Sequence, residues 1–186
     1  MDPKKILSDA RALEEAFFTK ENARLLEQLR ERKKREALRE VVQIKDDAFL
    51  DRLIELGINP ETVLALTLVP LTTVAWADGK LEDRERDAVI KAAVEKGIST
   101  GTPGHQLLET WLSQRPDKEL FESWKRYVGG IWETFTEEER RQMRKSTLDL
   151  ALAVAESAGG FLGLTSKVSG SERAVIKELE NVLPVS

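Results

Sequence analysis

The chain has 186 residues, of which 41% are hydrophobic and 33% charged, and 29 basic against 33 acidic residues give a formal net charge of −4. This mild acidity argues against general nucleic-acid binding, which needs a basic face, and the absence of cysteine excludes disulfides, thiolate zinc sites and cysteine nucleophiles. The longest apolar run, residues 63–77, is interrupted by Pro70 and is shorter than the ~18–20 residues that a membrane-spanning helix needs. Residues 1–8 lack a signal-peptide pattern. A soluble cytoplasmic protein is therefore expected.

Helix start and stop signals recur along the chain, and together they predict an all-α protein. Most of the predicted helices begin with Asp, Asn, Thr or Ser, which stands directly before a proline or three residues before a glutamate. The side chain of this residue can accept hydrogen bonds from the first free amides of the helix. Gly57 and Gly97, each followed by an isoleucine, are typical of helix ends. No stretch alternates like a strand, so no sheet is expected. The predicted helices cover residues 3–17, 19–44, 46–56, 60–77, 82–96, 103–113, 118–134 and 137–158, and a last one begins after Ser169.

The second predicted helix, residues 19–44, differs from the others in its charge. Residues 30–36 contain only Arg, Lys and Glu, and a helix that is polar all round is not stable as a buried element. The sequence therefore predicts a helical appendage over residues 1–57 and a core domain over residues 58–186. The basic run could contact nucleic acid or a phosphorylated partner, but a solvated helix with pairs such as Arg32–Glu36 is the favoured interpretation.

An internal repeat is the most informative feature of the core. A lysine is followed five residues later by Glu-Arg in two places, Lys80 with Glu85 and Lys167 with Glu172, and Val-Ile-Lys follows both times. Each copy predicts a helical hairpin with an apolar first helix. Two such hairpins are expected to pack their first helices together, residues 62–77 against residues 146–158, at the centre of a helical bundle.

The turn of the first hairpin resembles a known family. Residues 77–81 read Ala-Asp-Gly-Lys-Leu, with Glu85 early in the next helix, and this pattern resembles the TerB-like family of tellurite-resistance and DnaJ-type co-chaperone domains. The second copy keeps Glu172 but has Thr165 where a second aspartate would align. The resemblance covers roughly residues 60–182. It implies an all-helical fold and an association with metal stress, oxidative stress or chaperone systems, and it implies no reaction.

The acidic turn also raises the question of a metal site. Asp78, Gly79 and Glu85 match the second half of an EF-hand loop, but apolar residues stand where its first ligands belong. A weaker site for calcium or manganese would use Asp78, Glu82, Glu85 and Glu156, because only carboxylates are available. The favoured alternative is structural: Gly79 bends the chain, Asp78 accepts bonds from nearby amides, and the acids stabilise a helix N-terminus.

Other candidate sites are weaker. Asp149 and Glu156 share a helix face, but no histidine or nucleophile accompanies them. The only histidine, His105, is expected on the surface of the first turn of its helix. The glycine-rich loop at residues 159–167 lacks the spacing of a phosphate loop, and its apolar residues 161–164 are expected to dock into the core, although an exposed partner patch is the alternative.

Two adjacent glycines, Gly129 and Gly130, fall within the predicted helix 118–134 and its aromatic stripe. Glycine costs about 1 kcal/mol relative to alanine in a helix interior. The pair therefore predicts either close packing against another helix or a break near residue 129, while the aromatic residues themselves are expected to build the core.

These observations lead to two hypotheses about function. No nucleophile–base pair and no cofactor motif is present, so an enzyme is not expected. The first hypothesis is a non-enzymatic interaction or scaffold module with a protein partner, linked to stress through the TerB-like resemblance. The second is a divalent-metal-binding or metal-sensing domain that uses the acidic turn.

Overall fold

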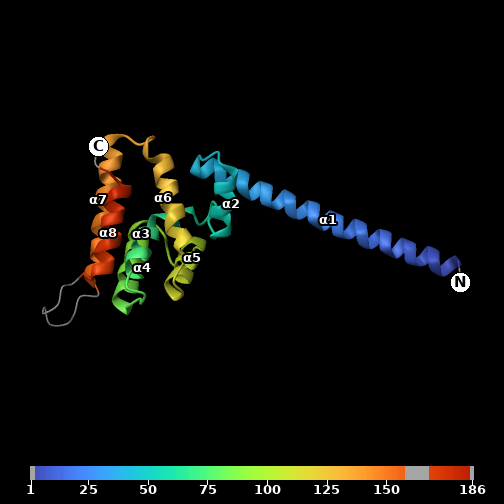
Figure 1. The fold of residues 1–186 in the computed structure, drawn as a ribbon, viewed down its shortest axis with the longest axis horizontal. Coiled ribbons are helices and arrows are strands. Elements are labelled where there is room, and N and C mark those ends of the chain that lie inside the picture. Colours follow the sequence, from blue (N-terminus) through green and yellow to red (C-terminus); the bar gives the residue numbers. More distant parts are fainter. Residues whose placement is uncertain (1–2, 158–167, 185–186) are drawn as a thin grey trace. The chain divides into compact units, whose positions relative to one another are not determined.

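A computed structural model describes residues 3–157 and 168–184 (Figure 1). Over these residues the chain forms eight α-helices and one 3-10 helix, and no strand, which confirms the all-α prediction. None of the helices in this part of the chain is both long and apolar enough to cross a bilayer. The predicted docking of residues 161–164 lies outside the described residues.

The chain divides into two compact units, Met1–Leu50 and Asp51–Ser186. The boundary falls inside helix α2, Asp47–Glu55, a few residues before the position suggested by the sequence, which was after residue 57. The first unit contains helix α1, and the second contains the two hairpins.

Helix α1 runs without interruption from Pro3 to Val42, so the prediction of two helices, 3–17 and 19–44, was wrong. Thr19 is a residue type that can begin a helix, but no glycine or proline precedes it to end one, and the residues around it favour continuation. The helix ends where Gln43 adopts a positive φ of 55°. Helix α2 then starts after Asp46, whose side chain accepts a hydrogen bond of 3.1 Å from the amide of Phe49.

The predicted single helix over residues 60–77 is broken in the structure. Residues Val63–Leu68 form the 3-10 helix η1, and residues Val69–Ala75 form helix α3. Pro70 explains the break, because it has no amide to donate and is tolerated only in the first turn of an α-helix. Asn59 still caps the segment: its side chain accepts bonds from the amides of Glu61 (2.8 Å) and Thr62 (3.1 Å).

The remaining helices begin where the sequence predicts. Thr102 and Asp117 accept bonds from the backbone of the following turn, and Thr136 and Ser169 form reciprocal capping pairs with Glu139 and Glu172. Gly57 and Gly97 have φ of +84° and +83° and close the preceding helices, as predicted. The helices are α4 Asp83–Glu95, α5 Pro103–Ser113, α6 Lys118–Trp132, α7 Glu137–Ser157 and α8 Gly170–Val182.

The two hairpins pack as the repeat predicts. Helix α3 lies against α7, α4 also contacts α7, and α8 contacts α3, so the two hairpins pack side by side (Figure 1). Every residue of α3 except Thr73 is buried. Helix α7 is covered on one face only, because Ala151 and Ala155 are buried whereas Leu152 is 44% exposed.

Helix α6 contributes aromatic side chains to the core, as predicted. Trp124 is 2% exposed and stacks on Phe121 with 5.7 Å between ring centroids. Neither interpretation of Gly129 and Gly130 was right: the helix continues through both, and a Cβ added at either would meet nothing within 4 Å.

Candidate functional site

The turn between α3 and α4 is held by its own backbone and side chains. Gly79 has a φ of +92°, a conformation that other residues rarely adopt, and the side chain of Asp78 accepts a 2.9 Å bond from the amide of Lys80. Glu82 is the N-cap of α4, and its amide donates a 2.8 Å bond to the carboxylate of Glu85. This is the structural role that the sequence favoured for the acidic turn.

The carboxyl group of Glu85 lies in the protein interior although the residue belongs to the first turn of α4. Glu85 is 4% exposed. Burial raises its pKa from 4.5 to about 7; the bond from the amide of Glu82 acts in the opposite direction, and the negative charges of Glu172 and Asp78 add to the increase. Glu85 is therefore close to half protonated at neutral pH.

Glu172 is the equivalent residue of the second hairpin and is also buried, at 5% exposure. It forms the same capping box with Ser169 at the start of α8. One of its carboxylate oxygens, Oε1, is fully buried and has no hydrogen-bond partner among residues 3–157 and 168–184. A buried polar atom without a partner is costly. The electrostatic effect of Glu172 on Glu85 shows that the two hairpins bring these two carboxyl groups into the same region.

The structure arranges the other predicted metal ligands differently. Asp78 and Glu82 are exposed at the turn, and their charges act on Glu85. Glu156, the ligand predicted from the second hairpin, is exposed near the end of α7. The residue of that hairpin whose charge acts on Glu85 is instead Glu172. Within residues 3–157 and 168–184, no three His, Asp or Glu side chains form a group suited to holding a metal ion. The metal site stays a prediction.

Two further candidates have structural explanations. Asp149 is exposed, and its carboxylate forms an ion pair with Lys145, one turn earlier in α7. The partner of Asp149 is therefore this lysine and not Glu156. His105 is 4% exposed, so the expectation of a surface histidine was wrong. Its ring nitrogen Nδ1 lies 3.8 Å from the carboxylate of Glu109.

A cavity of about 280 Å³ opens between α3, α6 and α8, and it was not predicted from the sequence. Trp76 and Phe121 form apolar walls, while Arg115, Lys118 and Glu178 belong to its lining as well. The lining carries charges of both signs, so its charge does not indicate whether a ligand would be an anion or a cation.

Helix α1 exposes apolar side chains over more than three turns. Phe17 is 65% exposed, Phe18 56%, Leu25 44% and Leu29 43%. Single exposed apolar residues are common, whereas a contiguous exposed apolar patch is typical of interaction surfaces. In the sequence this helix is identified by its charged residues, and the apolar residues among them were not predicted to form a site.

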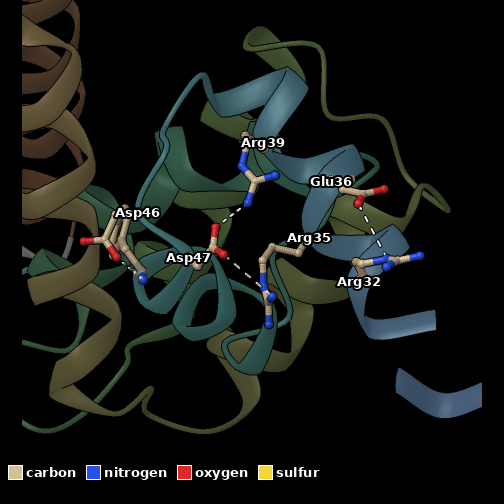
Figure 2. A network of polar contacts seen from close by, with 7 residues as sticks. Arg32, Arg35, Glu36, Arg39, Asp46 and Asp47 are labelled. Atoms are coloured by element: carbon tan, nitrogen blue, oxygen red, sulfur yellow. Dashed lines mark hydrogen bonds and ion pairs between the residues drawn. The ribbon is translucent and has the colours of Figure 1, made fainter. Parts of the chain in front are cut away.

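The second half of α1 contains several ion pairs. Figure 2 shows the guanidinium groups of Arg35 and Arg39 directed at the carboxylate of Asp47, the first residue of α2, and Arg32 beside Glu36 at 3.7 Å. Within residues 28–37 every side chain is exposed or half-buried, which agrees with the prediction of a solvated charged helix. Four of the five basic side chains of this segment, those of residues 30, 32, 34 and 35, lie within 4.0 Å of an acidic side chain of the same unit.

Comparison of the chain with protein-family models, with curated proteins and with solved structures found no match in any of the three. The TerB-like resemblance therefore rests on the residues of the Asp78 turn and of the repeat alone.

Proposed function

We propose that this protein is a non-enzymatic interaction module in which α1 binds a partner protein and the two-hairpin unit forms a stable body. The observation that carries the proposal is the series of exposed apolar side chains on α1, Phe18, Leu25 and Leu29. Ordered helices present such residues to solvent where another helix or a groove covers them in a complex. The TerB-like resemblance of the Asp78 turn supports a stress-linked or chaperone-linked setting for this module.

Photo-crosslinking tests the proposal. A photoreactive phenylalanine analogue is placed at Leu25 and, as a matched control, at Glu27, which is exposed on the opposite face of α1. Irradiation in cells that make the protein should give discrete protein adducts from position 25 and few from position 27, and Leu29→Asp in the same chain should reduce them. Equal yields from both positions, or no adducts, would contradict a binding surface on this face.

A divalent-cation site at the buried carboxyl pair is a second candidate. The observation in its favour is the buried Oε1 of Glu172, which lacks a partner and lies in the electrostatic range of Glu85. Calcium and manganese prefer such oxygen ligands. Calorimetric titration with each ion should give saturable heat that Glu172→Gln and Asp78→Ala both reduce. Heat that is equal in the variants would leave the carboxyl pair as structure only.

A further inference from the structure

Three of the exposed apolar residues of α1, Phe18, Leu25 and Leu29, lie at a regular spacing together with the polar residue Asn22. Phe17 and Leu26, which are 65% and 56% exposed, lie beside this series. Phe18, Asn22, Leu25 and Leu29 are separated by four, three and four residues, which places them along one face of an α-helix, and all four are exposed. This alternation of three and four is the spacing by which one helix packs against another. The apolar centre spans only 12 residues, so it is short for a coiled coil on its own.

The same spacing continues into charged residues on both sides of this centre. Toward the N-terminus it reaches Glu15 and then Arg11, and toward the C-terminus it reaches Arg32 and then Glu36. We name the positions 11, 15, 18, 22, 25, 29, 32 and 36 the α1 seam; in sequence they read Arg, Glu, Phe, Asn, Leu, Leu, Arg and Glu.

The α1 seam is complementary to itself when one copy is reversed. In the register that places position 18 opposite position 29, position 22 lies opposite position 25, position 15 opposite position 32 and position 11 opposite position 36. By sequence, the two outer pairs join an acidic to a basic residue. Each pair occurs twice about a two-fold axis that passes between residues 23 and 24, as an isologous dimer requires. In a parallel pair the same residues would meet themselves, Glu15 against Glu15 and Arg32 against Arg32, which is unfavourable.

The surroundings of the seam are compatible with this pairing. Arg32 and Glu36 keep side-chain exposures of 65% and 56% although they contact each other, so both are accessible to a second chain. Asn22 in the middle of the seam costs stability, because the residue opposite it in this register is Leu25.

We propose that α1 pairs with α1 of a second copy of this chain as an antiparallel coiled coil along the α1 seam. This inference rests on the proposed function and names the partner. The paired segment, residues 11–36, is about 39 Å long at 1.5 Å per residue.

Charge reversal tests the register in the full chain. Glu15→Arg and Arg32→Glu each create two like-charge contacts per dimer, so sedimentation equilibrium should show each single variant at least about tenfold weaker in dimerisation than the original chain. An equimolar mixture of the two variants restores opposite charges at both contacts, and the heterodimer should return to the original affinity. Arg30→Glu is the matched control, because it also loses an intrahelical pair, with Glu27 at 3.4 Å, but lies off the seam.

Cysteine pairing distinguishes the two orientations, since the chain has no cysteine of its own. In a mixture of Asn22→Cys and Leu25→Cys chains, oxidation should link the two different chains, whereas a parallel pair would link like chains. An original chain that stays monomeric up to about 100 μM, or single variants that dimerise as well as the original, would overturn the proposal. If the chain is monomeric yet Leu25 crosslinks to another protein in cells, the antiparallel dimer fails while the proposed function stands.

Discussion

Glu85 and Glu172 occupy equivalent places in the two hairpins, and each closes a capping box while its side chain is buried. An exposed glutamate at this position stabilises a helix start at little cost. Here the glutamate side chains are buried although residues beside them are exposed, so the capping bond forms together with desolvation of the carboxyl group. The raised pKa of Glu85 is the consequence, and the negative charge of Glu172 adds to the effect of burial.

The pH dependence of stability follows from the direction of this shift. The pKa of Glu85 is about 7 in the folded chain and 4.5 in the reference state, so its contribution to stability is fully present below pH 4.5 and is lost as the pH rises through 7. Glu85→Gln keeps the acceptor oxygen without the charge. Between pH 5 and pH 8 this variant should gain roughly 1–3 kcal/mol in unfolding free energy relative to the original chain.

Urea unfolding at the two pH values measures this difference. Asp87→Asn, an exposed carboxylate of the same helix, is the control and should change little with pH. A constant difference between Glu85→Gln and the original chain at both pH values would show that Glu85 does not bind its proton more tightly in the folded state.

The burial of these glutamates was not predictable from the sequence, although their equivalence was. Identical spacing from Lys80 to Glu85 and from Lys167 to Glu172 identified the repeat, and the capping chemistry is local. Whether a capping side chain is exposed or buried depends on how the hairpins pack against each other. For the same reason Glu156 was chosen as the partner from the second hairpin, whereas Glu172 acts on Glu85.

At the scale of elements, helix ends were predicted more accurately than helix continuity. The starts at Thr102 and Asp117 and the stops at Gly57 and Gly97 depend on bonds within a few residues, so the sequence contains them directly. The interruption between η1 and α3 depends on how one proline is accommodated, and the length of α1 depends on the lack of a stop signal near Thr19.

Two glycines that differ only in backbone conformation provide a prediction about these elements. Gly97 has a φ of +83° and Gly130 lies inside α6, and a Cβ at either position would meet nothing within 4 Å. Gly97→Ala should destabilise the protein by about 1 kcal/mol because it strains the backbone, whereas Gly130→Ala should stabilise it by about 0.5–1 kcal/mol. Thermal unfolding of both variants measures the effect, and changes of the same sign would contradict the assigned conformations.

At the scale of the whole molecule, the two units differ in how their helices are covered. In the second unit α3 is buried almost completely by the other helices. In the first unit the residues of α1 from Phe17 to Ala37 are exposed or half-buried, and Phe18, Leu25 and Leu29 are among them. A helix of this kind gains stability when another protein surface covers its apolar side chains. We therefore expect residues 18–29 to form a binding surface that an isolated chain leaves open.

Amide hydrogen exchange in the full chain tests this claim most directly. In dilute solution the amides of residues 18–29 should exchange much faster than those of α3, and at about a hundredfold higher concentration their exchange should slow while that of α3 does not change. This is the result expected if a second α1 covers the surface. Slow exchange of residues 18–29 at every concentration would show that the helix is already protected within one chain, and it would contradict the account.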